Sequence, residues 1–203
     1  INEFHYDNAG TDAGEFIEIA GPAGTDLTGW SIVLYNGSGN ASYNTRLLSG
    51  SIPDTTANGF GFVSATYPAD GIQNGSPDGL ALVDNNGVVR QFLSYEGTMT
   101  AANGPAVGMT SVDVGVTETS STPLGFSLQL SGTGTDYEDF TWAAAADDTP
   151  GATNNNQTFL GQPAAGVSVV QSGGSTAVTE GGAPDTFTVA LTTVPASDVT
   201  ITI

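Results

Sequence analysis

The sequence predicts an all-β protein that is built as a sandwich or a barrel. Short runs of β-branched and aromatic residues alternate with Gly, Asn, Asp and Pro along most of the 203 residues. Glycine is frequent, with 28 residues, whereas lysine is absent and glutamate is scarce, so few stretches favour a helix. Many short strands separated by turns are typical of packed or closed sheets.

The strand signal recurs along the first three quarters of the chain. The expected strands are 2–6, 15–20, 30–36, 45–50, 60–65, 80–84, 88–95, 126–130 and 138–142. The clearest hairpin joins 80–84 to 88–95 through Asn85-Asn86-Gly87, because Asn and Gly adopt positive φ at little cost. Large aromatic side chains are expected to fill the sandwich core. They are Trp30, Trp142, Phe16, Phe60, Phe62, Phe92, Phe126 and Phe140.

A second part of the chain begins after a stretch of small residues, Asn and Pro that follows Ala143. We expect a first domain over residues 1–158, a linker over 159–166 and an incomplete second β-domain over 167–203. Its four alternating segments are VSVVQSG, STAVTEGG, DTFTVALTT and DVTITI. Four strands bury one sheet face poorly on their own, so the remainder of this domain is expected to be missing or to come from another chain.

The charge is strongly one-sided. Asp and Glu number 21 against two bases, Arg46 and Arg90, which gives a formal net charge of −19. Binding to nucleic-acid phosphates needs clustered Lys and Arg, so nucleic acid is disfavoured as a partner, as are anionic membranes. No run of about 18 apolar residues predicts a membrane span. Self-repulsion of this size destabilises a compact state unless it is screened, so the charge favours multivalent cations as partners, salty surroundings, or both.

The stretch from Asn2 to Trp30 gathers acids without any Lys or Arg. Its acidic residues are Glu3, Asp7, Asp12, Glu15 and Glu18. Calcium prefers about six to eight oxygen ligands on Gly-containing loops, and the segment 7–15 (DNAGTDAGE) offers that chemistry without the EF-hand spacing. The alternative is a solvated turn whose acids keep an edge strand soluble.

A second acidic group surrounds the turn-rich segment DGIQNGSPDG. Its members are Asp70, Asn74, Asp78 and Asp84. The group is either a plain loop or meets the first acids in space. The candidate calcium ligands of the first domain are therefore Asp7, Asp12, Glu15 and Asp78.

The alternation in the segment 15–19 (EFIEI) has two interpretations. If Phe16 faces inward, Glu18 does too, and an inward acid needs an arginine or a metal as its partner. Otherwise Ile17 and Ile19 form the buried face and both glutamates are solvated. We predict the second arrangement.

The opening segment NEFHYDNAGTDAGEFIEI and Gly29-Trp30 resemble a lamin-tail domain, which is an immunoglobulin-like β-sandwich. Three later pieces fit the same resemblance: SPDGLALVD at 76–84, FSLQL at 126–130, and DFTW at 139–142 followed by TPGATN at 149–154. In bacteria this family occurs in secreted or surface-exposed multidomain proteins, at times beside a nuclease or phosphatase domain. The resemblance covers residues 1–158 and implies a module rather than a catalyst.

The segments TAVTEGG at 176–182 and FTVAL at 187–191 are similar to the start of a Calx-β domain, another sandwich that often binds calcium. The resemblance places Glu180 at a calcium-ligand position. The later acidic motif of that family does not occur before the last residue, so a complete site of that kind is not expected from this sequence alone.

Catalytic motifs are weak. His5 is the single histidine and no GxSxG segment accompanies it, so a packed or surface histidine is favoured over a hydrolase triad. One histidine and no cysteine make zinc a poor expectation. Paired carboxylates for glycoside hydrolysis and an aromatic platform for sugars stay open.

The sequence therefore predicts a non-catalytic structural or interaction module, extracellular or at the cell surface, that calcium stabilises. An unfinished second sheet could accept a strand from another copy, which would make the protein a fibre subunit. Other extracellular proteins are further candidate partners. The alternatives are an accessory domain of a secreted nuclease or phosphatase, and a carbohydrate-binding module.

Overall fold

The structure is a computed structural model that describes residues 1–161, 166–192 and 199–201. The chain divides into two compact units, residues 1–161 and residues 162–203. In the part that the structure describes, the regular elements are strands and two short 3-10 turns, so the predicted all-β class is confirmed. No helix among these residues is long and apolar enough to cross a bilayer.

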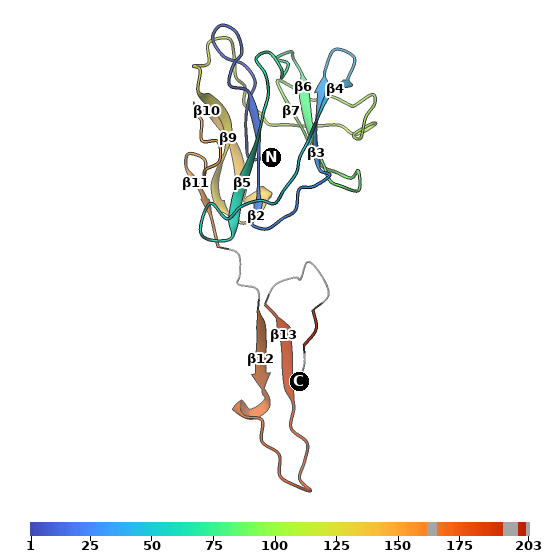
Figure 1. Ribbon diagram of the computed structural model, residues 1–203, viewed down its shortest axis with the longest axis vertical. Coiled ribbons are helices and arrows are strands. Elements are labelled where there is room, and N and C mark those ends of the chain that lie inside the picture. Colours follow the sequence, from blue (N-terminus) through green and yellow to red (C-terminus); the bar gives the residue numbers. More distant parts are fainter. Residues whose placement is uncertain (162–165, 193–198, 202–203) are drawn as a thin grey trace. The chain divides into compact units, whose positions relative to one another are not determined.

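The first sheet of the first unit has the order β10-β9-β1-β2-β5, with β11 also pairing with β9. Its strands are β1 (Glu3–His5), β2 (Phe16–Pro22), β5 (Phe60–Thr66), β9 (Phe126–Gly134), β10 (Phe140–Asp147) and β11 (Gln157–Phe159). All pairs are antiparallel except β11 with β9, which is parallel. The N-terminal strand thus lies in the middle of this sheet (Figure 1).

The second sheet has the order β4-β3-β6-β7-β8. Its strands are β3 (Ser31–Asn36), β4 (Ala41–Leu47), β6 (Asp78–Val83), β7 (Val89–Tyr95) and β8 (Val112–Asp113). The antiparallel β6–β7 pair confirms the predicted hairpin. The expected strand 45–50 overlaps only the end of β4, and the expected strand 138–142 begins with a 3-10 turn, Tyr137–Asp139.

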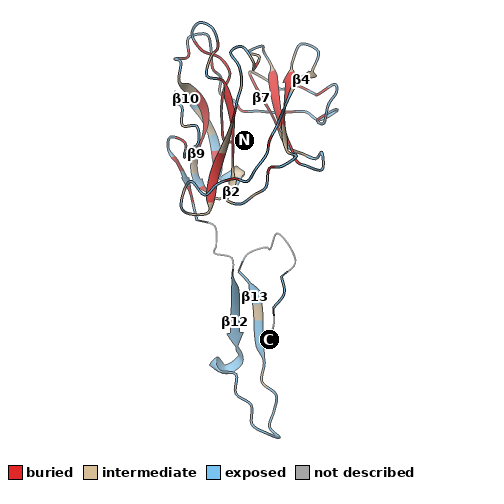
Figure 2. Cartoon of the chain, viewed as in Figure 1, coloured by how far each residue is buried: buried red, intermediate tan, exposed pale blue. Residues whose placement is uncertain are grey.

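The two sheets pack face to face as a sandwich, with buried residues between them (Figure 2). The central cluster takes Phe4, Ile17 and Leu128 from the first sheet and Leu34 and Leu80 from the second, among others. Tyr6 from the loop after β1 stacks on Tyr95 of β7 with ring centroids 4.0 Å apart. This contact joins the two sheets close to the β1–β2 loop.

Two further clusters bury side chains outside this core, which differs from the single aromatic core that the sequence predicts. One lies on the second sheet and includes Phe92, Val33 and Met99. The other surrounds β11 and consists of Phe60, Phe62, Leu130, Phe140 and Phe159. Because loops cover the outer faces as well, strands such as β6 are buried at every position.

In the second unit, β12 (Val167–Gln171) pairs with β13 (Phe187–Leu191) as an antiparallel two-stranded sheet. A 3-10 turn, Ser172–Gly174, follows β12. The expected strand STAVTEGG is irregular, so that prediction is wrong. Residues 162–165 of the expected linker and residues 198, 202 and 203 of the expected last strand lie outside the described residues. Residues 199–201 of that expected strand are described and are irregular.

Candidate functional site

Buried acids are the main chemical feature of the first unit. In the part of the chain that the structure describes, eight acidic side chains are buried: Glu3, Asp7, Asp12, Glu15, Glu18, Asp78, Asp84 and Glu118. The prediction that Glu15 and Glu18 are solvated is therefore wrong. Ile17 and Ile19 do face the core, but the loop that contains Gly151 covers the opposite face of β2 and buries Glu18. Glu15 lies just before β2 and is buried against the loop that contains Gly71 and Ile72.

Glu3 and Glu18 anchor the segment that follows β10. Thr149 donates from its backbone N to Glu3 Oε1 at 2.8 Å and from its hydroxyl to Glu3 Oε2 at 3.0 Å. Gly151 donates its backbone N–H to Glu18 Oε2 at 2.6 Å. Burial raises the pKa of Glu18 to about 7, although these hydrogen bonds act in the opposite direction. The predicted closing motif TPGATN is thus held on the sheet by two carboxylates.

Glu15 and Asp78 hold loops in a similar way. Glu15 accepts hydrogen bonds from the backbone N–H groups of Gly71 and Ile72 at 2.7 and 2.9 Å. Asp78 accepts from Gly37 and Gly75, both at 2.8 Å. Both carboxylates therefore serve as internal acceptors for backbone N–H groups of these loops. The N–H of Gly71 is shared with the carbonyl of Pro68, which lies 3.0 Å away.

His5 is packed and paired rather than free. Its Nδ1 lies 2.9 Å from Glu118 Oε1, and its Nε2 lies 3.1 Å from Asn8 Oδ1. Asn8 Oδ1 is fixed as an acceptor because it also receives the N–H of Ala13, while Asn8 Nδ2 donates to two backbone carbonyls. Burial alone would lower the pKa of His5, but the hydrogen bond and charge of Glu118 raise it to about 8. Both ring nitrogens are therefore engaged as donors, and the ring is not available as a base.

Asp7 is the exception among the buried acids. Seven of the eight accept at least one backbone N–H, whereas the described residues provide no such donor to the Asp7 side chain. Its carboxyl group instead contacts that of Asp12. Burial raises the pKa of Asp7 to about 6, and the charges of Asp12, Glu118 and Glu96 add to this effect. Two carboxyls in contact need a shared proton or a cation between them.

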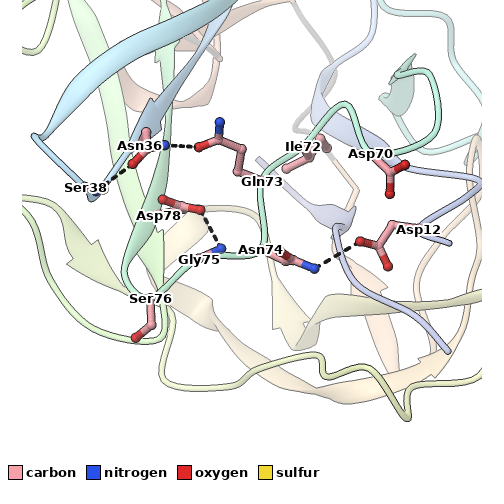
Figure 3. A pocket seen from close by; sticks show the side chains of 10 residues that line it. All are labelled: Asp12, Asn36, Ser38, Asp70, Ile72, Gln73, Asn74, Gly75, Ser76 and Asp78. Atoms are coloured by element: carbon pink, nitrogen blue, oxygen red, sulfur yellow. Dashed lines mark hydrogen bonds between the residues drawn. The ribbon is translucent and has the colours of Figure 1, made fainter. Parts of the chain in front are cut away.

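A polar pocket of about 420 Å³ opens beside this pair, where the β1–β2, β3–β4 and β5–β6 loops converge (Figure 3). Its lining residues are Asp12, Asn36, Ser38, Asp70, Ile72, Gln73, Asn74, Gly75, Ser76 and Asp78. Asn74 Nδ2 donates to Asp12 Oδ2 at 3.0 Å and so ties two of the loops together. The pocket thus brings the first acidic group of the sequence beside the second.

The structure separates the predicted calcium ligands into different environments. Asp7 and Asp12 are in contact, Asp12 and Asp78 share the pocket, and Glu15 bonds to the loop behind it. Glu180 is exposed in the second unit. Among the described residues, no group of three or more His, Cys, Asp or Glu side chains is arranged to hold a metal ion.

Asp84 is not part of the pocket. It organises the β6–β7 turn by accepting the N–H groups of Asn86 and Val88, and it pairs with Arg90, whose Nη2 lies 2.6 Å from Asp84 Oδ2.

No motif or spacing in the sequence singles out Glu118 and Glu96. Glu118 lies 113 positions from His5, in a loop with no periodic pattern, and only the fold brings the two together. Glu96 accepts the Tyr6 hydroxyl at 3.0 Å and has a left-handed backbone, with φ of 61°. A single glutamate before a glycine is a weak signal, so neither residue could be chosen from spacing.

Searches of the chain against protein families, curated proteins and solved structures found no match. The lamin-tail and Calx-β resemblances, including the immunoglobulin-like detail, therefore stay predictions from the sequence.

Proposed function

We propose that the chain is a non-catalytic structural or interaction module of an extracellular or cell-surface protein. The observation that carries this proposal is the use of the buried acids. Seven of them accept the chain's own backbone N–H groups, and the single histidine is bonded through both ring nitrogens. Side chains of the kind that catalyse hydrolysis are thus committed to holding loops. The resemblance of residues 1–158 to lamin-tail domains supports the same class.

Calcium is proposed as a stabiliser at the Asp7–Asp12 pair. Asp7 is 8% exposed and has no backbone donor among the described residues, so above pH 6 its charge faces that of Asp12 without compensation. A calcium ion can replace the shared proton by using both carboxylates and nearby backbone carbonyls as oxygen ligands. Of the four candidate calcium ligands in the first domain, we therefore keep Asp7 and Asp12 as ligands. Glu15 and Asp78 hold loops instead.

Calorimetry of residues 1–203 tests the calcium proposal. With calcium at about a hundred times its Kd, the melting temperature is expected to rise by about 5–10 °C at pH 8 and by much less at pH 5, where Asp7 is protonated. Asp7→Asn should remove the shift, and Asp54→Asn, an exposed acid before β5, should keep it. An equal response in all three proteins, or no response, would contradict the proposal.

Strand addition at the second unit is a second candidate function, since β12–β13 presents an uncovered apolar face. Val167, Val169, Phe187, Val189 and Leu191 share that face by their register, and all except the half-buried Val189 are exposed. A strand from another copy or from another extracellular protein could pair with either edge. Sedimentation across a range of protein and calcium concentrations tests self-assembly, and a monomer throughout would exclude it.

An enzymatic assay separates the proposal from its main alternative. Hydrolysis of DNA or of a phosphate ester by residues 1–203 would overturn the non-catalytic role and favour a secreted nuclease or phosphatase. Specific binding on a glycan array would instead favour a carbohydrate-binding module.

A further inference from the structure

The polar pocket between the three loops has the composition of a site for a positively charged group. Three of its lining residues, Asp12, Asp70 and Asp78, are acids, and none of the ten is basic. Asp70 is exposed, and its carboxylate has no hydrogen bond or ion pair within the described chain. Figure 3 shows this carboxylate and that of Asp12 facing the same space.

Amide groups complete the lining. The side-chain carbonyl of Asn74 and the side-chain amino group of Gln73 form no hydrogen bond within the described residues, although the other end of each amide is bonded. Ile72 is 1% exposed and supplies the apolar part of the wall. The pocket therefore combines two unbonded acceptors, the carboxylate of Asp70 and the side-chain carbonyl of Asn74, with one unbonded donor on Gln73 and one apolar side chain.

The size of the pocket distinguishes among cations. A space of about 420 Å³ is much larger than a bare metal ion, and the described side chains offer no group of three metal ligands there. An ammonium or guanidinium group with its aliphatic stem fits both the volume and the lining, because it carries only donors and an apolar chain. The net charge of −19 would also steer such a group towards the protein.

We propose that this pocket binds the cationic end of an arginine or lysine side chain that a partner protein presents. The inference rests on the proposed function, because it names the chemistry of one partner of the module. Asp70 would form the direct ion pair, and Asn74 would accept a further hydrogen bond. Asp12 and Asp78 would act mainly through their charge, because each already accepts two hydrogen bonds from the chain.

Nuclear magnetic resonance with short peptides tests the proposal on the full chain of 203 residues. The probes are N-acetyl-Gly-Arg-Gly-amide, its lysine analogue and its citrulline analogue, which has nearly the shape of arginine without the charge. The backbone amides of Gly71, Asn74 and Gly75 should shift and saturate with the arginine or lysine peptide and not with citrulline.

Two matched variants decide where the peptide binds. Asp70→Asn should weaken binding by about threefold, as expected for an exposed ion pair. Asp54→Asn removes the same charge at the opposite end of β5 and should leave the affinity unchanged. Calcium is a fourth probe and is added to the Asp7→Asn variant, which lacks the proposed calcium site beside Asp12, and there it should not displace the peptide from these amides.

Three results would overturn the inference. They are equal weakening by the two variants, equal shifts with citrulline, and saturation of the same amides by calcium in competition with the peptide. The first would mean general attraction to an acidic protein, and the third would mean a metal site. None of these results bears on the non-catalytic role, which the hydrolysis assay tests separately.

Discussion

Glu3 and Glu18 lie directly opposite each other in the antiparallel β1–β2 pair, and both side chains are fully buried. Like charges in this position destabilise a sheet unless donors surround them. Here Thr149 and Gly151 supply those donors from a segment more than 130 residues away in the chain. The pair therefore binds the N-terminal strand to the end of the first unit.

This relationship predicts the effect of changing Glu3 to glutamine. The new amide group would face the donors of Thr149, so one buried donor would lose its acceptor. Glu3→Gln should lower the free energy of unfolding by about 1–3 kcal/mol in urea denaturation. Glu138→Gln, which changes an exposed acid in the 3-10 turn, should alter it by less than about 0.5 kcal/mol. Similar values for both variants would show that the buried pair is not structural.

The His5–Glu118 pair predicts an unusual histidine titration. The pKa of His5 should be near 8 in the native protein because Glu118 stabilises the protonated ring. In Glu118→Gln burial should dominate, and the pKa should fall below the ordinary value of 6.5. The ring carbon resonances of the single histidine give this titration without ambiguity. A pKa that is the same in both proteins would contradict the pairing.

His5 also links this pair to stability. The pKa of His5 is higher in the folded protein than in the unfolded chain. Its contribution to the free energy of unfolding is therefore fully present below about pH 6.5 and is lost as the pH rises through about 8.

The Asp7–Asp12 contact predicts a stability that falls as the pH rises. Folding raises the pKa of Asp7 from 3.8 to about 6. Its contribution to the free energy of unfolding is therefore fully present below pH 3.8 and is lost as the pH rises from 3.8 through 6. In calcium-free buffer, Asp7→Asn should flatten the stability curve in that window. The difference between the two proteins at each pH gives the result, because groups common to both cancel. A curve of unchanged slope would contradict the contact.

The sequence was sufficient for the class of fold and for most strands of the first unit. Alternating residues and turn signals place β2, β3 and the β6–β7 hairpin, because these depend on local pattern. The parallel strand β11 and the two-residue strand β8 could not be predicted. Each forms only because a distant strand, β9 or β7, offers an edge for it.

The environment of the acids was harder to predict than the strands. Alternation correctly places Ile17 and Ile19 in the core, but it cannot show that a loop near residue 150 covers the opposite face and buries Glu18. The prediction that Glu18 is solvated is wrong for that reason. Asp7 and Asp12 belong to one loop, so their contact is local. The backbone N–H of Asp7, however, donates to Glu118, which lies more than a hundred residues away in the chain.

Amide hydrogen exchange tests the central claim, that buried carboxylates hold the loops of the first unit. The amides of Gly71, Ile72 and Gly151 lie outside strands but donate to Glu15 or Glu18. We expect them to exchange as slowly as strand amides, and much more slowly than the exposed Gly10, whose amide has no acceptor in the described chain. Exchange of all four at the rate of an unstructured peptide would contradict the account.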